Sequence, residues 1–164
     1  MIPIRVREHK NGSANASNSF VGISIWKGAP NFAAVLAQER YEWMFKWKLA
    51  LAMLPLALVV GYFTHWAVSP VIFAFSMLIS RIPSLLRRME LRGHAIEVAV
   101  AHKYYGVPLE VHEQSEARAM FYGYGGLFKS MGSDTVAGEL KKLRGWANEW
   151  VDEHADVIRQ DMKR

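Results

Sequence analysis

The chain has 164 residues, of which 51% are hydrophobic and 21% charged, so it suits one folded domain, or one small domain with appendages, and excludes a disordered chain. It contains no cysteine, which excludes disulfide scaffolds, zinc–thiolate sites and cysteine nucleophiles. Its net charge of +5 fits an anionic membrane surface or a nucleic acid, but no compact basic cluster with a recognition motif accompanies it, so we expect no nucleic-acid partner.

The N-terminal region, residues 1–31, has the pattern of a small β hairpin. Residues 2–7 (IPIRVR) alternate apolar and other side chains, which is typical of a short strand. Residues 11–19 (NGSANASNS) are rich in asparagine and serine, and we expect an exposed loop there. Residues 20–26 (FVGISIW) are β-branched and aromatic, which favours a second strand that pairs with the first.

Residues 32–105 are predicted to form a helical core. Asn31 is a residue type favoured at helix N-caps, and a helix over residues 32–48 leads from it directly into an apolar run. A second helix is expected from about residue 82 to about residue 104, where a Gly-Val-Pro sequence ends it.

The apolar run, residues 49–80, contains no aspartate, glutamate, lysine or arginine. Its two parts, residues 49–63 and 66–79, are each shorter than the roughly 20 residues that cross a membrane. We predict that they form a membrane-inserted helical hairpin. A single kinked span and a buried helix pair in a soluble core are the alternatives, although the rest of the chain is small for wrapping two apolar helices.

Basic residues flank the apolar run on both sides. They are Lys46, Lys48, Arg81, Arg87 and Arg88. Lysine and arginine gather on the cytoplasmic side of membrane segments, and a hairpin places both flanks on that one side. We therefore expect association with an inner or cytoplasmic membrane, with both termini in the cytoplasm.

The C-terminal region, residues 106–164, is predicted to contain polar helices and a glycine-rich connection over residues 122–133. The tail from residue 135 onward has apolar residues near helical spacing, so we expect one amphipathic helix there. The whole pattern predicts a mainly α fold with a small N-terminal β hairpin (α+β). Three histidines on separate segments are expected at the surface: His102, His112 and His154.

Two of the predicted helices carry polar residues at helical spacing. Gln38 and Glu42 are four residues apart and share one helix face, with Glu39 beside them, and Glu90 and His94 repeat this spacing on the later helix. If the apolar run turns back, these side chains converge. Such a cluster could bind a metal, hold a carboxylate pair for acid–base chemistry, or form a polar network that fixes helix register. Two separate solvated faces are the simplest alternative.

The order of these elements resembles the small zincin-like metallopeptidases of phages and bacteria over about residues 20–105. The matching segments are the strand FVGISIW, the helix VLAQERYEW, the apolar segment and the helix RRMELRGHAIEV. In that family, a helix bears the motif HExxH, whose histidines bind zinc and whose glutamate activates water. A glutamate on a later helix is the third zinc ligand.

Here Gln38-Glu-Arg-Tyr-Glu42 stands in the place of HExxH. The resemblance makes Glu39 match the general base and Glu90 the later ligand, while Gln38 and Glu42 stand where the histidines would be. Because both imidazole ligands are missing, the resemblance implies a pseudoenzyme that keeps the scaffold and has lost the metal. Together with the apolar run, it predicts a membrane-associated protein without a cofactor, which acts by binding a protein partner.

Two other functions remain open on the same residues. A rewired site for zinc or another divalent metal would use Glu42, Glu90 and His94, with Gln38 as a weak ligand. Such a chain would be an active metal-dependent hydrolase with Glu39 as its catalytic residue. The other possibility is a small integral membrane accessory protein of a phage or bacterium with no enzymatic activity.

Overall fold

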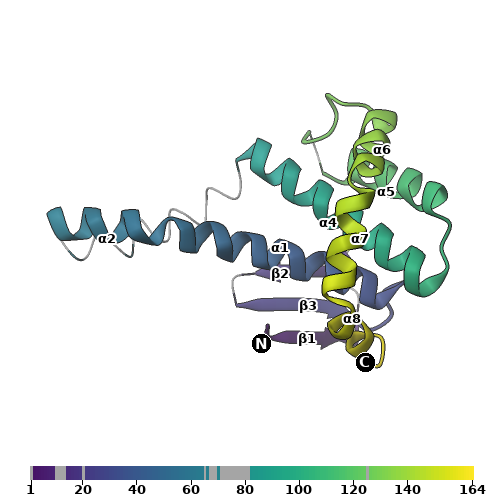
Figure 1. Cartoon of the computed structure of the whole chain (residues 1–164), viewed down its shortest axis with the longest axis horizontal. Helices are drawn as coiled ribbons and strands as arrows, with labels where there is room; N and C mark the ends of the chain where they lie inside the picture. The colour runs from purple at the N-terminus through teal and green to yellow at the C-terminus, as the bar shows by residue number, and fades with distance from the viewer. Residues whose placement is uncertain are drawn as a thin grey trace.

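The computed structural model describes these residues: 2–9, 14–19, 21–64, 66, 70, 82–124 and 126–164. The fold is mainly helical, with a small three-stranded sheet at the N-terminus. Figure 1 shows the long helix α1 between the sheet on one side and helix α4 on the other. This arrangement places α1 in contact with both the strands and the later helices.

The sheet has the strand order β1-β3-β2, with β1 (Ile4–Arg7), β2 (Ala16–Ser19) and β3 (Gly22–Trp26). β3 pairs in parallel with β1 and antiparallel with β2. The predicted hairpin between the first strand and residues 20–26 is therefore wrong, because the hairpin partner of β3 is β2, inside the predicted loop. The Ala-Ser-Asn-Ser sequence of this edge strand carries no β-branched or alternating apolar signal.

The inner face of the sheet packs against the start of α1 (Phe32–Ala52). Ile23 and Ile25 of β3 are 2% and 0% exposed, and they form an apolar cluster with Val35 and Leu36 of α1. This packing fixes β2 beside the same helix, and it thereby sets where the side chains of β2 can reach.

The helices α1 and α4 (Pro83–Tyr105) form the most extensive helix pair of the body. α4 ends at Gly106, whose φ of 70° lies in the left-handed region that glycine adopts without strain. The sequence therefore predicts both ends of α4 to within a residue or two. The chain folds back between α1 and α4, so helices on either side of the apolar run are neighbours.

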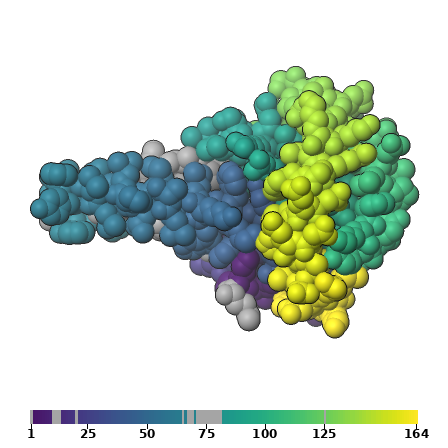
Figure 2. All heavy atoms as spheres, viewed as in Figure 1, coloured from purple at the N-terminus to yellow at the C-terminus, as the bar shows by residue number. Residues whose placement is uncertain are grey.

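The described part of the apolar run is mostly exposed. α2 (Leu54–Phe63) continues α1 after Met53 and projects away from the body (Figures 1 and 2). Within the described residues, the helical stretch Phe32–Phe63 is long and apolar enough, by length and composition, to cross a membrane. The second part of the predicted hairpin, residues 66–79, lies almost wholly outside the described residues.

Four helices complete the body: α5 (Leu109–Gly123), α6 (Ser133–Lys142), α7 (Arg144–Glu153) and α8 (Ala155–Asp161). The prediction of one continuous tail helix is wrong, because the helical hydrogen bonding is interrupted at Leu143 and at His154. The interruptions have a packing reason. α6 packs on α5, α7 on α4 and α8 on α1, so the interruptions separate three segments that contact three different helices.

Candidate functional site

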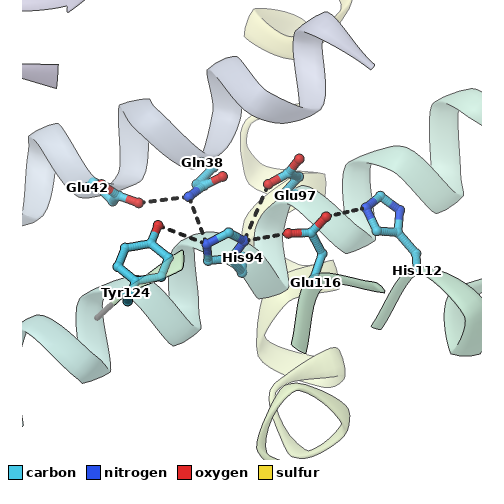
Figure 3. Close-up of polar contacts among 7 residues, drawn as sticks. All are labelled: Gln38, Glu42, His94, Glu97, His112, Glu116 and Tyr124. Carbon is cyan, nitrogen blue, oxygen red and sulfur yellow. Dashed lines mark hydrogen bonds and ion pairs between the residues drawn. The ribbon is translucent and has the colours of Figure 1, made fainter. Parts of the chain in front are cut away.

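A buried to half-buried group of polar side chains, here called the polar cluster, lies where β2, α1, α4 and α5 meet, and Figure 3 shows seven of its members. Its members are Asn18, Gln38, Glu39, Glu42, Glu90, His94, Glu97, His112, Glu116 and Tyr124. The five that the sequence predicts are Gln38, Glu39, Glu42, Glu90 and His94. These five are between 5% and 8% exposed, so they are interior groups and not two solvated helix faces.

Gly93 allows α4 to approach the polar face of α1. A Cβ atom at this position would lie 3.0 Å from Glu42 Oε1 and 3.1 Å from Gln38 Cγ, which is closer than carbon atoms normally pack. Without a side chain here, the two helices meet directly. Gln38 and Glu42 consequently face His94 and Glu90, as their helical spacing predicts.

On the side of α1, two amide groups donate to the carboxylates. Asn18 Nδ2 donates to Glu39 Oε2 and, at 3.0 Å, to Glu42 Oε2. Gln38 Nε2 donates to Glu42 Oε1 at 3.0 Å. Lys46 Nζ in turn donates to Asn18 Oδ1. Both oxygens of Glu42 are therefore satisfied by neutral donors, one from β2 and one from α1 itself.

The remaining carboxylates of this side hold protons readily. Burial and the charge of Glu42 raise the pKa of Glu39 to about 8 and that of Glu90 to about 7. Within the described residues, Glu90 Oε2 is buried without a hydrogen-bond partner. Glu39 is thus mostly protonated at neutral pH, whereas a general base must be unprotonated to act.

His94 connects this side of the cluster to α5. Its Nε2 atom lies 3.4 Å from Gln38 Nε2 and 3.1 Å from the Tyr124 hydroxyl oxygen. Its Nδ1 atom lies 2.8 Å from Glu116 Oε2 and 3.5 Å from Glu97 Oε2. Both ring nitrogens are therefore engaged, and the imidazole orientation is fixed by three helices.

The histidine side of the cluster is strongly charged. Burial lowers the pKa of His94, but its hydrogen bond with Glu116 and its ion pair with Glu97 outweigh this effect and raise the pKa well above its usual value. His112 Nε2 lies 3.3 Å from Glu116 Oε1. Burial raises the pKa of Glu116, yet its hydrogen bonds with both histidines bring that pKa down to about 2. This side is therefore a network of ion pairs.

The surface position predicted for His112 is wrong, because this residue is 7% exposed and faces the cluster. Its spacing from Glu116 is the same i, i+4 spacing that identifies Gln38 and Glu42, so a signal for this pair was present. Asn18 and Tyr124 had no such signal. They come from the segments predicted as an exposed loop and as a glycine-rich connection.

The residues at the position implied by the resemblance do not fit a catalytic zinc ion. Such a site needs three lone-pair ligands, usually with imidazole nitrogen among them. Gln38 directs an N–H donor toward Glu42, and Asn18 directs another between Glu39 and Glu42. The amide hydrogens thus occupy the directions from which a cation would approach, and no reaction step is assigned to a metal there.

Comparisons with protein-family models, curated proteins and solved structures found no match. The function must therefore be inferred from the geometry of the chain. That geometry has two features. The first is the polar cluster, in which amide donors and protons balance most of the carboxylates near α1. The second is the exposed apolar helix α2.

Proposed function

We propose that this chain is a membrane-associated, zincin-like pseudoenzyme, which keeps the scaffold of a small metallopeptidase without its catalytic metal and acts by binding a protein partner. The observation that carries the proposal is the pair of amide groups, from Asn18 and Gln38, that satisfy Glu39 and Glu42. In the family that the sequence resembles, the positions of Gln38 and Glu42 hold the two zinc-binding histidines.

The energetics of the cluster support the loss of the metal. A buried carboxylate needs a cation, a proton or several hydrogen bonds to offset the loss of hydration. Glu42 accepts two amide hydrogen bonds, one from Asn18 of β2 and one from Gln38 of α1, and Glu39 holds a proton at neutral pH. The carboxylates of α1 are therefore satisfied without a catalytic ion.

The exposed helix α2 supports membrane association. Leu56, Val59 and Phe63 are 50%, 53% and 79% exposed, and together they present an apolar surface that water disfavours. The exposed basic residues Lys48 and Arg88 lie near the base of this helix and near the fold-back. Their position favours a body in the cytoplasm, with residues 49–80 in the membrane.

A groove on the sheet is the candidate surface for the protein partner. It has a volume of about 380 Å³, and its lining includes Asn18, Val21 and Ile4. Val21 is 82% exposed, the largest exposed fraction among the large apolar side chains that the structure describes. Because Asn18 lines the groove and also bonds to Glu39 and Glu42, a partner in the groove would contact the edge of the polar cluster.

Restoring the missing ligands tests the proposal. The double variant Gln38→His/Glu42→His is expected to bind one zinc ion per chain more than the wild type, measured by elemental analysis of the detergent-purified full chain. Adding Glu90→Ala should remove that extra ion, because Glu90 would be its third ligand. The matched control Gln38→Ala/Glu42→Ala should gain no zinc.

Two outcomes would overturn the proposal. Zinc bound to the wild type at full occupancy, and lost with Glu90→Ala alone, would identify an active metal site at this position. Failure of the folded double variant to gain zinc would remove the zincin-like interpretation. It would then favour a membrane accessory protein without enzymatic ancestry.

A further inference from the structure

On the side of His94 that faces α5, three metal-ligating side chains converge away from α1. One ligand atom each from His94, Glu97 and Glu116 lies within 4.8 Å of the other two. The group joins α4 to α5 and contains none of the residues that match the family's zinc ligands. Figure 3 shows both carboxylates directed at the same ring nitrogen.

The carboxylates of Glu97 and Glu116 share one hydrogen-bond donor, and Glu97 lies farther from it than Glu116. Nδ1 of His94 carries a single N–H, which Glu116 accepts at 2.8 Å. Glu97 lies 3.5 Å from the same nitrogen, beyond the usual 2.7–3.2 Å range. The Glu97 side chain is 12% exposed, and the charges that act on it are those of His94, Glu116 and His112. One N–H of His94 therefore serves two carboxylates at this point.

The side chains of His94 and Glu116 each have a second polar contact that orients them, as metal ligands normally have. The Tyr124 hydroxyl lies 3.1 Å from His94 Nε2, which leaves Nδ1 facing the carboxylates. His112 Nε2 lies 3.3 Å from Glu116 Oε1, which leaves Oε2 facing His94. The histidine and the glutamate are therefore already oriented toward a common point before any ion arrives.

We propose that His94, Glu97 and Glu116 form a binding site for a divalent transition-metal ion such as zinc or manganese. One imidazole nitrogen and two carboxylate oxygens suit these ions, and two negative charges balance a doubly charged cation. The ion takes the place of the proton on His94 Nδ1, and that proton passes to solvent. Binding thus ties α4 to α5 and strengthens as pH rises.

Metal titration of the detergent-purified full chain, stripped beforehand with a chelator, tests this site. Calorimetry with zinc and visible absorption with cobalt are expected to give one ion per chain. Glu97→Gln and Glu116→Gln should each weaken binding at least about 100-fold. His112→Asn, which removes only the group behind Glu116, should weaken it about 10- to 100-fold.

Two controls keep the result interpretable. Glu110→Gln changes an exposed carboxylate on the same helix α5 and should leave the affinity unchanged. The metal-free variants should retain the helical circular dichroism of the wild type, and zinc should raise the melting temperature of the wild type but not that of Glu97→Gln.

Binding that Glu97→Gln leaves unchanged would overturn the inference, as would the absence of binding in the folded wild type. Binding that Glu90→Gln abolishes while Glu97→Gln preserves it would also overturn it. That last pattern would place the ion at the family's position and overturn the proposed function as well, whereas an absence of binding would leave the proposed function standing.

Discussion

The two halves of the helical stretch Phe32–Phe63 distribute polar and apolar side chains in opposite ways. The first half buries Gln38, Glu39 and Glu42 at 5–8% exposure, whereas the second half exposes Leu56 at 50% and Phe63 at 79%. Water-soluble proteins normally bury apolar groups and expose charged ones. Each half therefore departs from that rule, and each departure needs its own physical explanation.

For the first half, the explanation is local pairing. Amide donors and protons offset the burial of the carboxylates, so this half belongs to the packed body. Among the described residues, the second half packs against little besides the end of α1, and a hydrocarbon environment would provide the missing burial. The contrast shows that one helical stretch has a packed polar half and an exposed apolar half, and the predictions below test each half separately.

The largest effect is expected from charges in the exposed half. The double variant Leu56→Asp/Val59→Asp should move the protein from the membrane fraction to the soluble fraction, because each charge costs about 3 kcal/mol in hydrocarbon. Fractionation followed by alkaline carbonate extraction measures this. Val111→Asp is the matched control, since Val111 is 65% exposed on α5 in the body, and it should leave the distribution unchanged. Equal distributions for both variants would contradict a membrane role for α2.

A smaller effect is expected where the buried half meets α4. Gly93→Val should destabilise the fold by about 2–3 kcal/mol, because the new side chain would enter the space held by Glu42 and Gln38. Thermal unfolding followed by circular dichroism measures the loss. Gly138→Val is the control within helix α6, where a Cβ meets no atom within 4 Å. If both variants lose similar stability, helix propensity and not the close approach of α1 and α4 would be the cause.

The buried half is also the part of the site that could be predicted from the sequence. Helix geometry alone puts Gln38 and Glu42 on one face and Glu90 and His94 on another. Only one nonlocal condition, the return of the chain after the apolar run, was then needed to bring the four together. The return of the chain could be predicted because basic residues flank the apolar run on both sides.

The rest of the site depends on packing that local patterns do not encode. Asn18 reaches Glu39 because β2 pairs with β3, and the polar sequence of β2 gives no strand signal. Glu116 reaches His94 because the face of α5 that carries His112 and Glu116 packs toward α4. The spacing of these two residues does not show whether that face is buried or exposed to solvent. The sequence therefore predicts residues on shared helix faces better than residues joined by tertiary pairing.

The smallest effect concerns the proton on Glu39, and its sign follows from the raised pKa. The folded chain holds this proton up to about pH 8, whereas the unfolded chain releases it near pH 4.5, so the free energy of unfolding falls as pH rises between these values. Glu39→Gln removes the titrating group while keeping an acceptor for Asn18. The variant should match the wild type near pH 5 and be more stable than the wild type near pH 8.5.

The neighbouring charges determine how much of the slope remains. Glu42 and Glu90 favour the proton on Glu39, and Lys46 opposes it. Because the pKa of Glu90 is also raised, to about 7, part of the decline in stability with pH should persist in Glu39→Gln. Chemical unfolding at pH 5 and 8.5 measures both slopes, with the exposed Glu110→Gln as a control that should follow the wild type. An unchanged slope in Glu39→Gln would mean that Glu39 is ionised throughout, and that a cation, not a proton, balances the buried half of the helix.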